Sequence, residues 1–366
     1  MRILSITPAF APQIGGIEQV VQELAIRLRR RGHQVDVAHV ATGHASRSTD
    51  EVKGLTVHRL PMKGHRLVGC VPGLADLAGQ YDLLHVHDPQ LMAITANVRW
   101  SCPGLPAVLS THGGFRHTQQ LSTFKSLFER LALRRVLRHY KRVLASSVSD
   151  QAYFDLYSDR VELCSNGVST DKFGVVPVGL DRSLDRWIYW GRLSKNKRVD
   201  QLIDVVAQAH GQGWPVDLLI CGRDFDGVLP QLRAQVERLG LAQAIRFESY
   251  LSDEDLLAEL QGRGVYATAS EHEGFGLSIV EAMAAGMQIL CRDMTPLNSF
   301  VTAGQTGQFL RFDGGTQDAE ALRALQGQDE AARQRARTTA RAVADQYNWD
   351  AAAHRFEQVF QQVVGA

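Results

Sequence analysis

The chain has 366 residues, of which 45% are hydrophobic and 22% charged, and its formal net charge at pH 7 is +1. This ordinary composition excludes an intrinsically disordered chain and leaves room for two domains. The apolar runs have strand length, far below the roughly 20 residues of a membrane-spanning helix. The near-neutral charge gives no signal for nucleic acid, and the first residues are too short an apolar run for a signal peptide.

Five cysteines are scattered along the chain without a CxxC pair. Such spacing fits neither a disulfide framework nor a zinc site, and it favours reduced thiols in a cytoplasmic protein. The five are Cys70, Cys102, Cys164, Cys221 and Cys291.

Strand and helix patterns alternate from the first residue. We expect a strand over Arg2–Thr7, a glycine-containing loop, a helix with its apolar face over Val21–Leu28 and a strand over Gln34–Val40. The same order continues through strands expected at 83–87 and 107–111. Repeated βαβ units predict a parallel sheet covered by helices.

A second series of the same kind begins at Trp187, so we expect a second α/β domain. Residues 166–186 contain several Gly and Pro residues without periodicity and indicate a linker. We therefore divide the chain into an N-terminal domain over 1–176, a C-terminal domain over 177–345 and a closing helix over 346–366. Strands of the second series are expected at 187–190, 216–221, 245–248, 265–269 and 288–291, with helices at 199–210, 228–239 and 278–285.

Gly15 and Gly16 stand between the first strand and the first helix. Adjacent glycines allow close approach of the backbone to a ligand, and the helix amides behind them favour an anion. A tight turn without a ligand explains the pair as well, because the full GxGxxG dinucleotide fingerprint is absent.

Arg192 and Lys197 follow the strand that ends at Trp190. Ligands of open parallel sheets bind at the carboxyl ends of strands, and a guanidinium with a nearby ammonium suits a diphosphate. The alternative is a solvated basic turn.

The segment 270–286 is the most specific in the chain. A strand is expected to end before Glu273, a turn at Phe275 and Gly276 follows, and a helix begins near Leu277. Turn amides at a helix start can bind an anion, and Glu281 inside the helix can accept hydrogen bonds from sugar hydroxyls. A surface position for Glu281 is the alternative, which its apolar neighbours disfavour.

This segment resembles the signature of the family 4 glycosyltransferases, retaining enzymes of the GT-B fold, which reads close to EGFGLxxxEAMAxG. The resemblance covers nearly the whole chain and implies two Rossmann-like domains facing a central cleft, with the last helix packed back onto the N-terminal domain. Further matches are GGxE at 15–18, RGHEV at 31–35, HVH at 85–87, NGV at 166–168 and GRL…K at 191–197.

The resemblance implies roles for residues of the C-terminal domain. Arg192 and Lys197 would bind the donor diphosphate, Glu281 the nucleotide ribose, and Glu273 the transferred sugar. Turn amides for the phosphates and sugar would come from Phe275, Gly276 and Leu277.

In the N-terminal domain, the resemblance places Gly15 and Gly16 over the diphosphate and His112 beside the reacting sugar. We count His112, Glu273, Arg192 and Lys197 as candidate catalytic residues. Without the resemblance, a lone histidine in such a loop is more often structural.

We expect no metal and no cofactor, because the nucleotide sugar is a substrate and Arg192 with Lys197 can neutralise the leaving diphosphate. Asp224-Phe225-Asp226 spells the DxD motif with which metal-dependent transferases of the other main fold hold a divalent ion, but the cationic pair makes a metal unnecessary here. The loop 222–227 and the stretch 292–296 depart from the family pattern, which leaves the donor sugar and base open. His85 and His87 point the same way from a strand without further ligands nearby.

Eight Lys or Arg residues against one acid lie between Arg116 and Arg142. Apolar residues at roughly helical spacing from Leu121 to Leu144 predict an amphipathic helix, which could bind an anionic membrane surface. The alternative is a helix packed in the core with a solvated basic face.

We therefore expect transfer of a hexose from GDP-mannose or a UDP-hexose to a glycan or lipid-linked acceptor hydroxyl, with retention, in the synthesis of a bacterial exopolysaccharide, O-antigen or glycolipid. The protein would be cytoplasmic and peripheral on the inner face of the cell membrane. A non-hydrolysing sugar-nucleotide epimerase of the same fold is the alternative. A Rossmann-type dehydrogenase is disfavoured because the sequence lacks the GxGxxG fingerprint. An inactive scaffold is disfavoured because the motifs of the family are intact.

Overall fold

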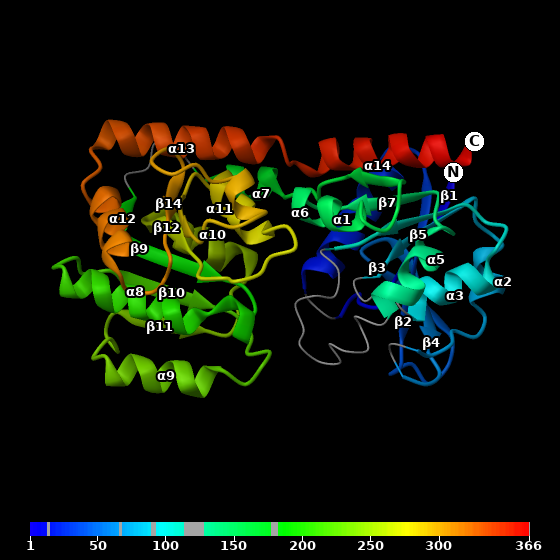
Figure 1. Ribbon diagram of the computed structural model, residues 1–366, viewed down its shortest axis with the longest axis horizontal. Helices are drawn as coiled ribbons and strands as arrows, with labels where there is room; N and C mark the ends of the chain where they lie inside the picture. The colour runs from blue at the N-terminus through cyan, green and yellow to red at the C-terminus, as the bar shows by residue number, and fades with distance from the viewer. Residues whose placement is uncertain (13–14, 66–67, 89–92, 113–127, 177–181, 366) are drawn as a thin grey trace. The chain divides into compact units, whose positions relative to one another are not determined.

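The computed structural model describes residues 1–12, 15–65, 68–88, 93–112, 128–176 and 182–365 (Figure 1). The chain divides into two compact units, Met1–Gly167 with Trp349–Ala366 and Val168–Asn348. The sequence placed this boundary later, at 176/177. Val168, Phe173 and Val176 are buried in the core of the second unit, so the residues just after Gly167 pack with that unit.

The first unit is built on an eight-stranded sheet in the order β3-β4-β2-β1-β5-β6-β7-β8. Its strands run parallel except β3, which pairs antiparallel with β4. The strands are β1 Arg2–Thr7, β2 Gln34–Ala41, β3 Ser48–Val52, β4 Leu55–Pro61, β5 Leu83–His87, β6 Ala107–Ser110, β7 Arg142–Ala145 and β8 Val161–Leu163.

Helices of the first unit complete the predicted βαβ pattern. Leu4 and Ile6 of β1 face one apolar cluster, which also takes up residues of α2, α3, α5 and α6. The helices are α1 Gly16–Arg30, α2 Leu74–Ala78, α3 Ala93–Ser101, the π-helical turn η1 Glu129–Leu133, α5 Arg134–Leu137, α6 Val148–Phe154 and α14 Trp349–Val364.

The closing helix α14 packs against α1. Glu357 of α14 accepts hydrogen bonds from Arg31 Nε at 2.7 Å and pairs with His33 Nε2 at 2.8 Å. Burial by itself would raise the pKa of Glu357. The hydrogen bonds from His33 and Arg31 outweigh that effect, so the pKa of this carboxyl lies below its usual range. The Arg-Gly-His segment after α1 is therefore the clamp for the last helix.

The second unit has a six-stranded sheet in the order β11-β10-β9-β12-β13-β14. All of its pairings are parallel, and the order is that of a doubly wound dinucleotide-binding sheet. The strands are β9 Ser183–Trp190, β10 Asp217–Cys221, β11 Ile245–Glu248, β12 Arg263–Ala267, β13 Gln288–Cys291 and β14 Gly307–Phe309.

Both faces of this second sheet are covered, as the continuous burial of its strands requires. Leu218 and Ile220 of β10 face one cluster with α8, α9 and α12, whereas Leu219 faces another with α7, α10, α11 and α13. The helices are α7 Thr170–Gly174, the 3-10 turn η2 Lys195–Lys197, α8 Val199–Gly211, α9 Leu229–Arg238, α10 Asp253–Gly262, α11 Leu277–Ala284, the 3-10 turn η3 Leu297–Ser299, α12 Thr316–Gln326 and α13 Glu330–Asp345.

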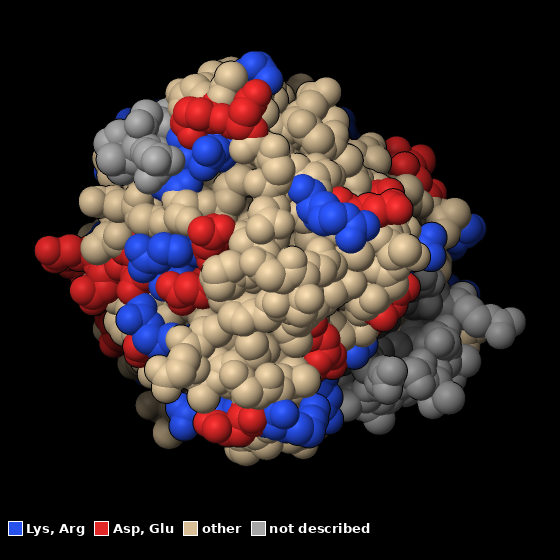
Figure 2. Space-filling model, turned by 90° about the vertical axis from the view of Figure 1, so that its left-hand side faces the viewer, with Lys and Arg blue, Asp and Glu red and all other residues tan. Residues whose placement is uncertain are grey.

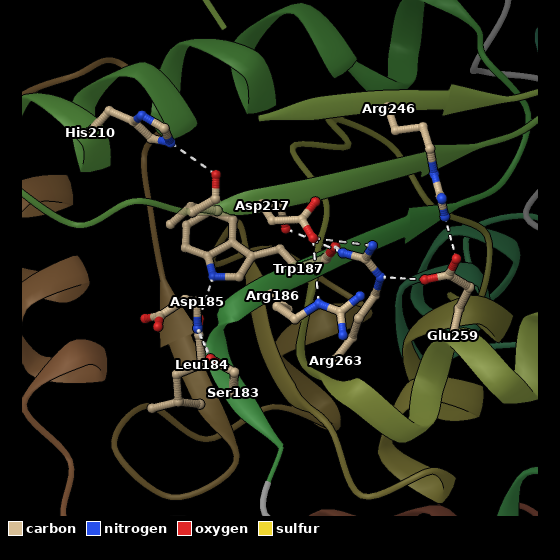
Figure 3. Close-up of polar contacts among 11 residues, drawn as sticks. Ser183, Leu184, Asp185, Arg186, Trp187, His210, Asp217, Arg246, Glu259 and Arg263 are labelled. Carbon is tan, nitrogen blue, oxygen red and sulfur yellow. Dashed lines mark hydrogen bonds and ion pairs between the residues drawn. The ribbon is translucent and has the colours of Figure 1, made fainter. Parts of the chain in front are cut away.

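A buried arginine ties the amino ends of these strands together. Arg263 is 2% exposed, donates from Nη1 to Trp187 O at 2.7 Å and pairs with Glu259 through Nε at 2.9 Å. Its Nη2 lies 3.4 Å from Asp217, which also pairs with Arg186 (Figure 3). This network lies at the end of the sheet opposite the carboxyl ends of its strands, so its contribution is to stability.

The predicted basic helix over 121–144 is wrong after Leu137. The helix ends at Leu137, and Arg142–Ala145 is strand β7, paired with β6 and β8. Leu137 and Tyr140 are buried in the core, so their apolar spacing reflects core packing. Residues 113–127 lie outside the described part of the chain.

Acidic and basic side chains are interspersed over the face shown in Figure 2, as the small net charge suggests. Among the described residues, every helix is too short or too polar to span a membrane.

Candidate functional site

The loops after β9 and β10 approach each other so closely that glycine is required. A Cβ on Gly222 would lie 1.8 Å from the carbonyl oxygen of Gly191, and Gly191 itself has φ +154°, a conformation that side chains rarely adopt. Leu193 N–H donates to Arg223 O and Phe225 N–H donates to Leu193 O, both at 2.9 Å. These bonds fix the loop that carries Arg192.

Arg192 stacks on the ring of Phe225, a residue that no sequence motif assigned to the site. Its guanidinium lies 4.9 Å from the ring centroid of Phe225, whose side chain is 66% exposed. Tyr189 Oη donates to the carbonyl of Arg192 at 2.9 Å, and burial raises the pKa of that phenol well above its usual range. The only sequence signal for Phe225 was its place in a loop that departs from the family pattern.

Lys197 and Glu273 are brought together from loops 76 residues apart. Lys197 Nζ lies 2.6 Å from Glu273 Oε1, and both side chains are mostly buried, at 16% and 12% exposure. Glu271 N–H donates to Asn196 O at 2.9 Å, which joins the loop after β9 to the loop after β12. These strands are neighbours where the strand order reverses, the place at which doubly wound sheets bind ligands.

The turn from Glu273 to Leu277 leads into α11. Gly276 has φ +94° and precedes the helix, whose first turn receives no side-chain cap, so its amides remain available to an anion. The Phe275 side chain is 5% exposed and packs edge-on against Phe300 and Tyr347. The ring of Phe275 therefore belongs to the core of the second unit.

Glu281 is a buried residue of α11, with 8% exposure. The indole N–H of Trp190 donates to its Oε2 at 3.1 Å. This excludes the surface position left open by the sequence. Trp190, the last residue of β9, was not singled out as a site residue, and only its place at a strand end pointed to it.

In the first unit, the predicted glycine pair opens a helix. Gly15 is the N-cap residue of α1 in an extended conformation, and α1 begins at Gly16 without a side-chain cap. A Cβ on Gly15 would lie 2.6 Å from the Glu18 carboxylate. The first backbone amides of α1 therefore receive no hydrogen bond from the side chain of the N-cap residue.

His112 follows β6 with φ +50°, which is uncommon for a residue with a side chain. Its Nε2 lies 2.9 Å from Nδ1 of His87, and the two rings are stacked with centroids 5.2 Å apart. Burial lowers the pKa of His112 to about 4 and that of His87 well below its usual range. Both rings are therefore neutral near pH 7.

His85 and His87 do point the same way, with ring centroids 3.9 Å apart. His85 bonds to Ser110 Oγ at 2.8 Å, and burial lowers its pKa to about 3. In the described part of the chain, no group of three or more His, Cys, Asp or Glu side chains is arranged to hold a metal ion.

The DxD carboxylates both bind backbone amides. Asp224 accepts from Val228 N–H at 2.9 Å and caps the approach to α9, and Asp226 accepts from Lys195 N–H at 2.9 Å. Asp224 and Asp226 therefore stabilise the conformation of the loop beside Arg192.

The structure thus assembles two groups of predicted residues. The second unit gathers those at the carboxyl ends of β9 and β12, namely Arg192, Lys197, Glu273, Phe275, Gly276, Leu277 and Glu281. The first unit holds Gly15 and Gly16 after β1 and His112 after β6.

Comparison with known proteins points to one family. The model described as Glycosyltransferase Family 4 matches residues 14–172, and that described as Glycosyl transferases group 1 matches residues 180–343. GDP-mannose:cellobiosyl-diphosphopolyprenol alpha-mannosyltransferase of Komagataeibacter xylinus is 30% identical over all of this chain and 94% of its own. Phosphatidyl-myo-inositol mannosyltransferase of Mycobacterium tuberculosis is 28% identical over all of this chain and 98% of its own.

Solved structures support the fold. Sucrose-phosphate synthase from Thermosynechococcus elongatus superposes with a TM-score of 0.80 at 19% identity, covering all of both chains. The comparisons give the epimerase alternative no support. The full-length match at 30% identity and the two family matches show that this chain belongs to glycosyltransferase family 4, and it is a nucleotide-sugar-dependent glycosyltransferase of the GT-B fold.

Proposed function

We propose that the protein transfers mannose from GDP-mannose, with retention, to a hydroxyl of a glycan carried on a polyprenyl diphosphate. The donor and acceptor are those named for the Komagataeibacter relative, and two Xanthomonas relatives of the same name match over the full chain. The more distant mycobacterial relatives are also mannosyltransferases with a lipid acceptor. A UDP-hexose is the competing donor, because UDP and glucose occupy the structurally similar Anabaena protein HepE.

The observation that carries this proposal is the convergence of Arg192, Lys197 and Glu273 on one edge of the second sheet. Arg192 and Lys197 bind the diphosphate, Glu273 contacts the sugar, and Glu281, fixed by Trp190, accepts from the ribose. Amides of Phe275, Gly276 and Leu277 add donors for the phosphates. We assign Gly15 and Gly16 to the diphosphate and His112 to the sugar.

The chemistry follows from charge development. The bond between the anomeric carbon and the diphosphate oxygen breaks, its electron pair goes to the diphosphate, and Arg192 and Lys197 stabilise that charge. The acceptor hydroxyl oxygen then bonds the anomeric carbon, and its proton passes to the departing diphosphate oxygen. Glu273 pairs with Lys197 at 2.6 Å, which fixes the position of its carboxyl group beside the oxocarbenium-like sugar, so we assign Glu273 electrostatic support of that charge. No metal enters this scheme.

A nucleotide titration tests the donor site. Calorimetry with GDP, UDP and ADP is expected to show binding of GDP above the others, weakened about tenfold or more by Arg192→Ala or Lys197→Ala, since each loses a charged contact. Arg335→Ala is the matched control, because Arg335 is an exposed cation on α13. A folded protein that binds none of the nucleotides contradicts the proposal, and selective UDP binding replaces mannose by a UDP-hexose.

An exposed patch of the first unit suits the membrane on which such an acceptor resides. Trp100, Leu131 and Leu156 are 72%, 62% and 61% exposed. Basic residues lie among them, since Arg134 donates to Leu156 O at 2.7 Å and Arg99 donates to Arg135 O. We propose peripheral binding to anionic lipid through this patch, each cation adding about 1 kcal/mol.

Liposome sedimentation tests the membrane proposal. Binding to phosphatidylglycerol vesicles at low salt is expected, with loss at high salt and weakening by Trp100→Ser or Arg134→Ala. Tyr250→Ser is the control, an aromatic residue of the second unit that is 60% exposed. Equal recovery of protein from anionic and neutral vesicles would remove the membrane proposal and leave the donor chemistry intact.

A further inference from the structure

Three histidines of the first unit form a continuous row, in which the buried His85 and His87 lead to the half-buried His112. His85 packs against Phe356 and Phe360 of α14, with ring centroids 5.6 and 5.0 Å away. His87 lies next to His85, and its Nδ1 reaches Nε2 of His112 at 2.9 Å. The closing helix α14 therefore packs against the His85 end of the row. At the other end, the buried His87 contacts the His112 ring.

The contact between His87 and His112 contains a single hydrogen-bonding proton. Two neutral imidazoles 2.9 Å apart form one N–H···N bond, in which one ring donates and the other accepts. The ring that donates at this contact is decided by what its other nitrogen meets.

The second nitrogen of His87 settles the direction of the bond. Its Nε2 is buried and, in the described part of the chain, has no hydrogen-bond partner. A proton on Nε2 would be a buried donor without an acceptor, and such orphaned N–H groups are rarer in native proteins than under-satisfied acceptors. His87 therefore carries its proton on Nδ1, and this N–H donates a hydrogen bond to Nε2 of His112.

We propose that His87 is a positioning residue that holds His112 as the neutral tautomer protonated at Nδ1. His112 accepts from His87 at Nε2, so its Nδ1–H becomes a hydrogen-bond donor fixed in direction. For catalysis, and here the inference rests on the proposed function, His112 then donates to an oxygen of the bound sugar. It does not act as a base through Nε2, which is already occupied.

The tautomer can be measured without any substrate. Two-bond ¹H–¹⁵N correlation spectra of the full chain labelled with ¹⁵N-histidine distinguish protonated from unprotonated ring nitrogens, and His112→Gln assigns the His112 signals. We expect Nδ1 of wild-type His112 to be protonated and Nε2 to be bare. A His112 ring protonated at Nε2 overturns the proposal.

Two substitutions of His87 separate positioning from packing. His87→Leu removes the donor, and we expect His112 to populate both tautomers and kcat to fall about tenfold with the donor KM unchanged. His87→Asn places an amide N–H near the lost Nδ1–H, so we expect it to restore the Nδ1–H tautomer and most of kcat. His87→Leu with wild-type tautomer and kcat overturns the proposal.

The readouts keep this inference apart from the proposed function. If the wild-type protein transfers no sugar from any nucleotide donor, the function proposed above fails, and the spectra still decide the tautomer. If His87→Leu does not fold, the wild-type and His87→Asn spectra decide it, because an unchanged Nδ1–H signal is required in both.

Discussion

Gly167 and Trp349 are in direct contact where the chain leaves the first unit and returns to it. A Cβ on Gly167 would lie 2.4 Å from Cε3 and 2.6 Å from Cα of Trp349. On the other side of the same crossing, Val168 N–H donates to Tyr347 O at 2.7 Å. The Asn-Gly-Val segment is thus explained by the close approach of the two chain segments, since a side chain at 167 has no space.

Gly167→Ala is expected to destabilise the protein by about 3 kcal/mol, at the upper end of overpacking effects, because Trp349 is 1% exposed and its backbone also blocks the methyl group. Chemical denaturation followed by tryptophan fluorescence measures this. Gly104→Ala is the control, since a Cβ there meets nothing within 4 Å. Equal effects of the two substitutions would contradict the steric account.

Phe225→Leu is expected to raise the donor KM about two- to fivefold and to leave kcat nearly unchanged. The ring holds the Arg192 guanidinium at 4.9 Å, and an exposed cation–π contact contributes about 0.5–1 kcal/mol. Steady-state kinetics with varied donor measure the effect. Phe225→Tyr keeps the π face, so its donor KM should match that of the wild type. An equal donor KM for the Leu and Tyr variants would contradict the role of the ring in holding Arg192.

Arg263→Met is expected to lower the free energy of unfolding by about 1–3 kcal/mol, because the Trp187 carbonyl loses a buried donor and Glu259 loses a buried partner. The loss stays moderate because Glu259 keeps Arg246 and the half-exposed Asp217 keeps Arg186. Thermal and chemical unfolding report the loss. The residue lies at the strand ends opposite the candidate site, so nucleotide affinity of the folded variant should match wild type. A large loss of nucleotide affinity with little loss of stability would contradict the purely structural role assigned to Arg263.

Stability should fall as the pH drops below about 6.5, and His85 should account for part of the fall. Burial lowers its pKa from 6.5 to about 3, so between these values the unfolded chain binds a proton that the folded protein does not. The sign is therefore loss of stability on acidification, ending near pH 3. The expected slope is about 1.4 kcal/mol per pH unit for one group.

His85→Phe tests that assignment. Its free energy of unfolding, measured by denaturant titration between pH 5.5 and 4, should change with pH about one proton less steeply than that of the wild type. A lower stability at every pH is expected from the lost bond to Ser110, so only the slope is diagnostic. Parallel pH profiles would exclude His85 as the titrating group.

The sequence by itself determined the two α/β units and the segments in which the candidate site residues lie. Period-2 and helical patterns with glycine punctuation are local signals, and they located β1, β5, β11 and β13 at their observed bounds. The Glu273–Gly286 signature is also local, because it encodes a strand end, a glycine turn and a helix start in consecutive residues.

Tertiary structure alone decided which distant residues meet. The residues around Lys197 in the sequence do not indicate that its ammonium lies 2.6 Å from the Glu273 carboxylate. In the same way, the sequence around Glu281 does not indicate its hydrogen bond with Trp190. Both pairs form because of the order in which the parallel strands lie side by side. The error over 121–144 has the same origin. Leu137 and Tyr140 match a helical period, but Arg142–Ala145 gains more as a strand, where its backbone bonds to β6 and β8 and Val143 enters the core.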